Sequence, residues 1–318
     1  EYFDVELWAA GYEKNTKYDV SKITTKYFNK DRVLKAIPDF YSSLKEAKPD
    51  VVISSISHLN IVMGLLSIFN PKTKFIGREA NVLSIKAKFG NKKNKLYNLI
   101  PLTKIGYKFL DLILCQSKDM FNDMKLNYGV PEKKLRLINN PITDNFKLKS
   151  QNTNSNGVFQ FITVASLKKQ KGHERIIKAL SKLKAPFKYT IVGDGPENNY
   201  LFNLINELGI QDKIEHVPYT NEVSKYLSKS DFFLQGSYVE GFPNSLIESC
   251  AVGTPVIAYN APGGLDEIIE EGINGYVANN DEDYIKTLLK ATQKNDWNSR
   301  LISESVYNKF SKEKRIND

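Results

Sequence analysis

Two glutamates, Glu240 and Glu248, lie on the same stretch of chain with seven residues between them. We expect a strand to end near Gln235, a loop to carry Glu240, and a helix to begin at Asn244 and Ser245 with an Asn or Ser cap. A helix start attracts anions through its open N–H groups and its dipole, while carboxylates accept hydrogen bonds from vicinal hydroxyls. We interpret this stretch as a site for a polyhydroxylated phosphate ester. The alternative is a capping arrangement in which Glu248 only supports the helix entry.

The surrounding sequence alternates strand-like with helix-like segments, which is typical of parallel sheets covered by helices on both faces. A first strand is expected at 5–10. In the rest of the first half, strands are expected at 50–56, 74–77, 112–115 and 135–138, and helices at 33–47, 59–69, 96–109 and 117–128. In the second half, strands are expected at 159–165, 189–192, 214–217, 232–235 and 255–259, and helices at 174–183, 199–208, 222–227 and 244–252.

This alternation predicts an α/β fold of two doubly wound, Rossmann-like domains that face a cleft, where ligands bind at the carboxyl ends of strands. The first domain is expected at 1–145, a polar, turn-rich linker at 146–157, and the second domain at 158–318. The first half lacks a Gly-rich opening turn, so we expect its first strand, loop and helix to be missing. The last helix is expected to pack back on the first domain.

The chain has 318 residues and a net charge of +9, and the excess of positive charge lies in its first half. No acidic residue occurs between Ala80 and Leu110, where lysines alternate with aromatic and aliphatic residues. This pattern indicates contact with an anionic membrane surface or lipid head group, with a solvated Lys-rich face as the alternative. Nucleic acid is disfavoured because Lys, rather than the base-reading Arg, dominates.

Composition excludes several classes of protein. Cys115 and Cys250 lie in different halves and in apolar settings, which excludes a disulfide scaffold and a cysteine-based zinc cluster and favours the reducing cytoplasm. No spacing of His, Asp and Glu resembles a metal site. The longest apolar runs fall far short of the ~18 residues that span a bilayer.

Six motifs in sequence order resemble the retaining glycosyltransferases of family four, which have the GT-B fold. The central one is Glu240 to Glu248, read as Glu-Gly-Phe-Pro-Asn-Ser-Leu-Ile-Glu, which is similar to the E-x7-E signature. The others are Lys171-Gly172, Val192-Gly193-Asp194-Gly195-Pro196, Gly253-Thr254-Pro255-Val256-Ile257, Gly263-Gly264 with Glu267-Ile268-Ile269, and Gly272-Ile273-Asn274-Gly275. The resemblance is strongest over about 158–280, and Asn139-Asn140-Pro141-Ile142 resembles the segment that closes the first domain.

The resemblance implies transfer from a nucleotide-activated sugar, with retention at the anomeric carbon and without an essential metal or other cofactor. The second domain would hold the donor. Glu248 would bind the ribose hydroxyls, Glu240 would contact the donor sugar, and Lys171 would neutralise the diphosphate. The remaining donor-binding positions would be Gly241, Phe242, Pro243, Asn244, Ser245 and Leu246 through their backbone, with Ser166, Gly193, Asp194, Gly195 and Val217 around the pocket.

One position departs from the family pattern, since Ser166 stands where an Arg usually precedes the leucine at 167. Lys168 or Lys169 would compensate this loss in charge but not in bidentate geometry.

In the first domain, His58 follows a strand at its carboxyl end and would either act on donor or acceptor hydroxyls or cap a helix. Arg78 and Glu79 follow the next strand and would bind the acceptor or form a surface ion pair; Lys92 and Lys93 are also assigned to the acceptor.

These observations predict a retaining, metal-independent hexosyltransferase of cell-surface polysaccharide synthesis, such as lipopolysaccharide or capsule. It would use a UDP-sugar and a glycan or lipid-linked sugar acceptor, in the cytoplasm and peripherally at the inner face of the plasma membrane. The alternatives are a non-catalytic or truncated sugar-nucleotide-binding protein, or a UDP-sugar epimerase on the same scaffold.

Overall fold

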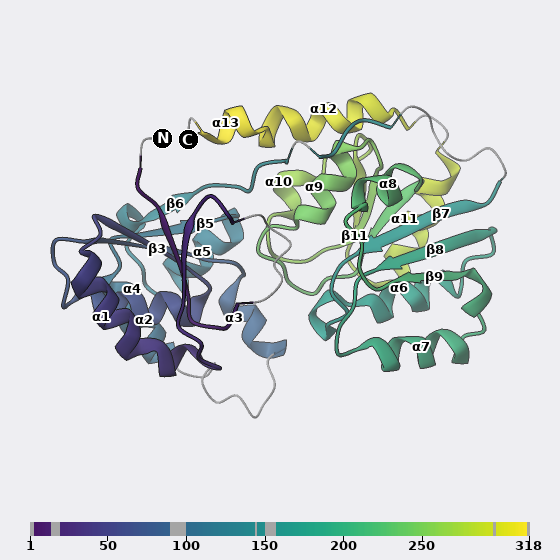
Figure 1. Cartoon of the computed structure of the whole chain (residues 1–318). Coiled ribbons are helices and arrows are strands. Elements are labelled where there is room, and N and C mark those ends of the chain that lie inside the picture. The colour runs from purple at the N-terminus through teal and green to yellow at the C-terminus, as the bar shows by residue number, and fades with distance from the viewer. Residues whose placement is uncertain are drawn as a thin grey trace. The chain divides into compact units, whose positions relative to one another are not determined.

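The structure is a computed structural model that describes residues 3–13, 20–89, 100–143, 145–149, 157–294 and 297–316 (Figure 1). Packing divides the chain into two units that are not continuous in sequence. The first unit comprises Glu1–Ala80, Lys95–Leu114 and Met124–Arg136, and the second comprises Asn81–Asn94, Cys115–Asp123 and Leu137–Asp318. The domain boundaries expected at 145 and 158 stay a prediction.

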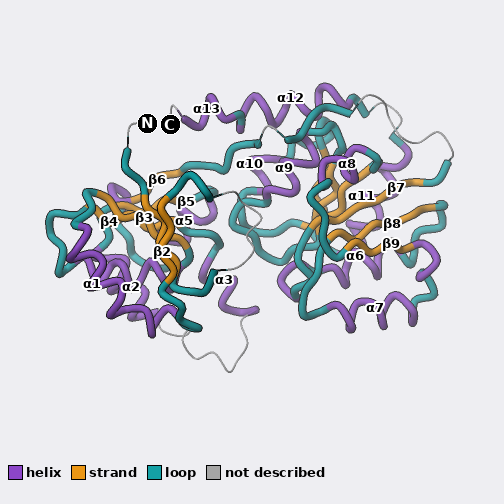
Figure 2. Tube along the Cα trace, in the orientation of Figure 1, coloured by secondary structure: helices purple, strands orange, loops and turns teal. Residues whose placement is uncertain are grey.

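The second unit contains a six-stranded sheet, whose strands are orange in Figure 2. The strand order is β12-β11-β10-β7-β8-β9, with the parallel pairing that the alternating pattern predicts. Its strands are β7 Phe159–Val164, β8 Phe187–Val192, β9 Ile214–Val217, β10 Phe232–Gln235, β11 Val256–Tyr259 and β12 Gly275–Ala278. Its helices are α6 His173–Leu180, α7 Asn198–Glu207, α8 Val223–Ser228, α9 Asn244–Ala251, α10 Leu265–Ile268, α11 Asp281–Gln293, α12 Ser299–Phe310 and α13 Lys312–Ile316. Sequence analysis gave no bounds for β12 or for the elements from α10 onward, although it expected a last helix.

Each face of this sheet carries a separate apolar core, because successive strand residues point to opposite faces. Phe161 and Leu234 pack with buried residues of α6, α7 and α11, whereas their neighbours Ile162 and Phe233 pack with buried residues of α9 and α12. The covering helices therefore form two layers, and the strand ends between them are fixed from both sides. In α12, Ile302 is fully buried against the second core, so this helix packs within the second unit.

The first unit contains two sheets. Strands β3 Val51–Ser55, β4 Lys74–Arg78, β5 Leu112–Cys115 and β6 Leu135–Leu137 form one, and β1 Glu6–Ala9 pairs in parallel with β2 Thr24–Tyr27 in the other. The helices are α1 Ile37–Ala47, α2 Ser57–Ser67, α3 Leu83–Lys86, α4 Ile100–Phe109 and α5 Lys118–Leu126; the last starts within the second unit, to which α3 also belongs.

The edge strand β3 leaves Val51 and Ile53 49% and 65% exposed, although strands of a parallel sheet are normally buried on both faces. Of the helices in the described residues, none has the length and hydropathy needed to cross a membrane.

Helices α2 and α4 approach each other through two glycines. A Cβ atom on Gly64 would lie 2.0 Å from the carbonyl oxygen of Gly106, and one on Gly106 would lie 2.8 Å from the Cα atom of Ile61. Both obstacles are backbone, which cannot rotate away as a side chain does. The two helices can therefore pack this closely only because neither Gly64 nor Gly106 carries a side chain.

We expect Gly64→Ala to lower the free energy of unfolding by about 3 kcal/mol, because an added methyl group forces the two helices apart. Urea denaturation monitored by circular dichroism measures the change. Gly11→Ala is the matched control, since a Cβ atom there has no neighbour within 4 Å. Equal stability of the Gly64→Ala variant and the wild type would contradict this packing.

Candidate functional site

Helix α9 starts where the donor phosphate is predicted, but not with the predicted cap. The N-cap residue is Pro243, with φ −78° and ψ 91°, and its side chain makes no capping hydrogen bond to the first turn of the helix. The Asn or Ser cap is therefore wrong: the Oδ1 atom of Asn244 instead accepts a hydrogen bond from Asn140 Nδ2 at 2.7 Å. The N–H groups of Leu246 and Ile247 donate to the Pro243 carbonyl oxygen at 3.1 and 3.4 Å. Because a proline side chain has no acceptor, the N–H groups of Asn244 and Ser245 are left for another acceptor.

Two side chains at this helix start belong to the core. Phe242 is 6% exposed and packs edge-on against Phe310 with ring centroids 5.3 Å apart, and Leu246 is fully buried. Their side chains thus serve the core, which leaves backbone groups as their only means of contacting a ligand. The role that the family resemblance implies for residues 241–246 stays a prediction.

Glu248 lies one turn inside α9, and no described residue donates a hydrogen bond to its partly buried carboxylate. Burial raises the pKa of Glu248 to about 7 from an ordinary value of 4.5. A carboxylate that is desolvated without a partner is costly for the folded protein. Such a group is suited to accept hydrogen bonds from a ligand's hydroxyls.

Glu240 is placed in a cluster with Lys171 and Ser237. Lys171 Nζ lies 2.7 Å from both carboxylate oxygens of Glu240, and the Ser237 hydroxyl donates to Oε1 at 2.5 Å. The Glu240 side chain is 8% exposed and that of Lys171 is 25% exposed, so the ion pair is largely removed from water. Lys171, which the resemblance assigns to the diphosphate, therefore forms an ion pair with the other predicted catalytic residue of this unit.

The loops after β7 and β8 lie backbone to backbone. Leu167 N–H donates to Asp194 O at 2.9 Å, and a Cβ atom on Gly193 would lie 2.0 Å from the Ala165 carbonyl oxygen. Gly193 N–H in turn donates to Val217 O at 2.9 Å. The structure thus joins the segments of Ser166, Gly193, Asp194, Gly195 and Val217, five predicted donor residues from three strand ends.

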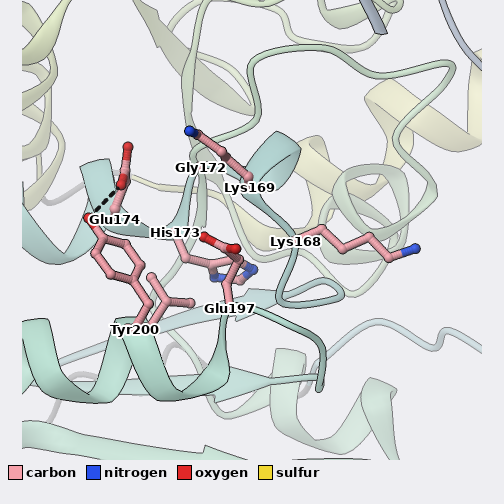
Figure 3. A pocket seen from close by; sticks show the side chains of 8 residues that line it. Lys168, Lys169, Gly172, His173, Glu174, Glu197 and Tyr200 are labelled. Carbon is pink, nitrogen blue, oxygen red and sulfur yellow. Dashed lines mark hydrogen bonds between the residues drawn. The ribbon is translucent and has the colours of Figure 1, made fainter. Parts of the chain in front are cut away.

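A small pocket opens beside these loops (Figure 3). His173 lies in it at 2% exposure, and its Nε2 atom lies 3.3 Å from the Ser166 carbonyl oxygen, to which it donates. Burial lowers the pKa of His173 to about 4, so the ring is neutral and fixes the backbone of Ser166. The other lining residues are Lys168, Lys169, Gly172, Glu174, Glu197, Tyr200 and Leu201. Neither of the two predicted carboxylates, Glu240 and Glu248, is among the residues that line this pocket.

Three predicted residues, His58, Arg78 and Glu79, lie in the first unit. Glu79 is fully buried, and its Oε1 atom accepts hydrogen bonds from Asn60 Nδ2 at 2.7 Å and from the Tyr107 hydroxyl. Arg78 donates to the Ser55 hydroxyl at 3.2 Å, and His58 lies in the first turn of α2. Their roles stay predictions, while Lys92 and Lys93 lie outside the described residues.

Ser237 is the site residue that sequence analysis missed. It precedes Glu240 by three positions, in the turn that follows β10. A short loop that follows a buried strand can bring two residues three positions apart together. The Ser-x-x-Glu spacing was therefore the feature of the sequence that could have indicated Ser237. Lone serines are too common for that spacing to be specific.

Two family models cover nearly the whole chain. Residues 144–306 match the family described as glycosyl transferases group 1, and residues 2–146 match the glycosyltransferase family 4 model. The chain therefore belongs to the group 1 glycosyl transferases. This confirms the resemblance deduced from the E-x7-E stretch.

Several of the similar curated proteins have names that state an activity, among them the following two. The N-acetylgalactosamine-N,N'-diacetylbacillosaminyl-diphospho-undecaprenol 4-alpha-N-acetylgalactosaminyltransferase of Campylobacter jejuni is 29% identical over 73% of this chain and 64% of its own length. The N-acetyl-alpha-D-glucosaminyl L-malate synthase of Bacillus anthracis is 27% identical over 69% of this chain and 61% of its own length. The matched region thus spans less than two thirds of each of these relatives.

Solved structures share the fold at low sequence identity. Anabaena HepE, solved in complex with UDP, superposes with a TM-score of 0.77 at 16% identity and covers 93% of this chain and 84% of its own. Sucrose-phosphate synthase from Thermosynechococcus elongatus superposes with a TM-score of 0.81 at 16% identity, over 98% of this chain and 86% of its own. The predicted α/β fold of GT-B type is confirmed.

Proposed function

We propose that the protein transfers a hexose or N-acetylhexosamine from a UDP-sugar to a glycan or lipid-linked sugar, with retention of anomeric configuration and without an essential metal. The observation that carries this proposal is the carboxylate of Glu248, which is partly buried and receives no hydrogen bond from a described residue. Vicinal ribose hydroxyls would supply two donors and offset the cost of desolvation.

The uncapped start of α9 supports the phosphate half of the proposal. Its N–H groups and dipole favour an anion, and Lys171 adds a full positive charge in the same unit. Glycosyl transfer leaves negative charge on the departing diphosphate, and stabilising that charge lowers the barrier. The leaving phosphate would accept the proton of the acceptor hydroxyl, so Glu240 is assigned to the donor sugar rather than to a nucleophile.

The acceptor is inferred from the chemistry of the sequence and of one relative. The C. jejuni enzyme's name describes a saccharide on a diphospho-undecaprenol carrier, and the Lys-rich stretch between Ala80 and Leu110 carries no acid that would repel such a diphosphate. A carrier of this kind would place the protein peripherally at the inner face of the plasma membrane, in surface-polysaccharide synthesis.

The test titrates the whole chain calorimetrically with UDP, GDP and ADP, and then incubates it with UDP-GlcNAc, UDP-GalNAc, UDP-Gal or UDP-Glc and a polyprenyl-diphosphate-linked saccharide, with and without EDTA. We expect selective binding of UDP and an EDTA-insensitive product whose new linkage keeps the donor's configuration by NMR. An epimerised UDP-sugar would indicate an epimerase, and an inverted linkage would contradict the proposed mechanism.

Two observations favour a second candidate, a sugar-nucleotide-binding protein without turnover. Ser166 replaces the family's bidentate Arg, and the charge of Lys171 is already paired with Glu240. Both features reduce the positive charge available to a departing diphosphate. Binding of UDP without transfer of sugar from any of the four UDP-sugars would favour this candidate.

A further inference from the structure

Arg175, in the first turn of α6, makes three hydrogen bonds to the loop that carries Glu240. Its Nε and Nη2 atoms donate to the Gly236 carbonyl oxygen at 2.8 and 2.6 Å, and Nη2 also donates to the Ser237 carbonyl oxygen at 2.5 Å. These carbonyls follow the end of β10, where the regular sheet pairing stops. The guanidinium is thus the anchor of the first part of this loop, whereas Gln170 Nε2, which donates to the Val239 carbonyl oxygen at 2.9 Å, and the Glu240 N–H, which donates to Pro262 O at 2.8 Å, hold its second part.

The same guanidinium lies between two aromatic rings. Its central carbon is 3.9 Å from the ring centroid of Tyr238 and 4.0 Å from that of Tyr259. Tyr259 stacks in turn on Tyr284, with centroids 4.1 Å apart and planes inclined by 5°. Since Tyr259 and Tyr284 are 1% and 0% exposed, the column is anchored in the core of the second unit.

Further contacts fix both ends of this arrangement. The Tyr238 hydroxyl donates to Glu174 at 3.2 Å, and Tyr238 N–H donates to the Gln170 carbonyl oxygen at 2.9 Å. The start of α6 touches the loop directly, because a Cβ atom on Gly172 would lie 1.9 Å from the Gly236 carbonyl oxygen. Helix α6 and the loop are therefore joined by direct backbone contact as well as through Arg175.

Arg175 reaches Glu240 through Ser237. Its guanidinium holds the Ser237 carbonyl, while the Ser237 hydroxyl donates to the Glu240 carboxylate that also pairs with Lys171. We propose that Arg175 is a positioning residue, which holds Ser237 and thereby aims the Glu240 carboxylate at the donor sugar. The expected effect of Arg175 on kcat/KM rests on the proposed function. Its expected effect on the structure of the loop does not depend on turnover.

Arg175→Lys is the informative substitution, because it keeps the charge but loses the planar fork and the stacking surface. We expect amide hydrogen exchange over residues 236–240 to accelerate at least tenfold. We also expect kcat/KM for the UDP-sugar to fall 10- to 100-fold, whereas the Kd for UDP, which depends on Glu248, changes less than about threefold. The matched control is Arg136→Lys in the first unit, whose Nη1 atom also donates to two backbone carbonyls, those of Lys133 and Leu135.

A double-variant cycle separates positioning from general stabilisation. If Arg175 acts through Ser237, adding Ser237→Ala to Arg175→Lys costs little further kcat/KM, whereas independent roles make the two losses multiply. Multiplied losses, or unchanged exchange over 236–240, overturn the proposal.

A second variant and the exchange readout keep the test decisive. Should Arg175→Lys not fold, Tyr238→Leu removes one stacking ring at the partly exposed end of the column and is expected to accelerate the same exchange, and unchanged exchange there also overturns the proposal. If the wild type turns over no donor, the proposed function fails, while the exchange result still decides the role of Arg175.

Discussion

Glu248→Gln is expected to weaken UDP binding about a hundredfold, because the amide replaces a charged acceptor of two hydroxyl hydrogen bonds. The wild-type affinity should fall as the pH drops through about 7, where Glu248 takes up a proton. The glutamine side chain of the variant does not titrate. The remaining pH dependence of its UDP affinity therefore reports protonation of the UDP phosphate alone, which occurs near pH 6. Calorimetric titrations between pH 5.5 and 8.5 measure both curves.

The same substitution is expected to stabilise the protein without ligand. The pKa of Glu248 is raised in the folded state, so its contribution to stability is complete below pH 4.5 and is lost as the pH rises through about 7. Glutamine avoids this loss, so the variant should gain on the order of 1–3 kcal/mol over the wild type at pH 8 but not at pH 4.5. Denaturant titrations at both pH values measure the difference.

Glu207→Gln, in the exposed end of α7, is the matched control for both experiments and should alter neither binding nor stability. Unchanged UDP affinity in Glu248→Gln would remove Glu248 from the nucleotide site. A stability difference of the same size at both pH values would contradict the raised pKa.

Lys171→Met is expected to lower turnover at least a thousandfold and to destabilise the protein by about 3 kcal/mol. Both effects come from one charge: Lys171 would stabilise the departing diphosphate, and in the structure it compensates the buried carboxylate of Glu240. Removing it leaves that carboxylate without its cation. Donor turnover and urea denaturation of the variant measure the two effects separately.

The double variant Lys171→Met with Glu240→Gln separates stability from activity. It should recover much of the lost stability, because no buried charge remains, and it should stay inactive. Lys286→Met is the matched control, since Lys286 pairs with Glu282 at the same 2.7 Å but with side chains 71% and 79% exposed; its melting temperature and turnover should equal those of the wild type. Turnover within tenfold of the wild type in Lys171→Met would overturn the role of Lys171.

Much of the fold and the family could be predicted from local sequence. The alternating apolar pattern around Phe161 and Ile257 reflects strands buried on both faces, and the structure places these residues in the core. The stretch from Glu240 to Glu248 indicated the family because a loop, a helix start and two carboxylates must occur at fixed spacing. Weakly patterned elements were missed, such as β12 at Gly275–Ala278, whose assignment depends on pairing with β11.

Tertiary structure decided what the chemical groups of the site contact. Sequence alone assigned Lys171 to phosphate and predicted an Asn or Ser cap for α9, whereas folding pairs Lys171 with Glu240 and leaves Pro243 as the cap. It also brings Arg175 to Ser237 across 62 positions of chain. Spacing along the chain determines local geometry, and therefore the motif can be recognised in the sequence. The partners of a buried charge depend instead on which distant segments pack around it and exclude water. Only the folded chain specifies that packing.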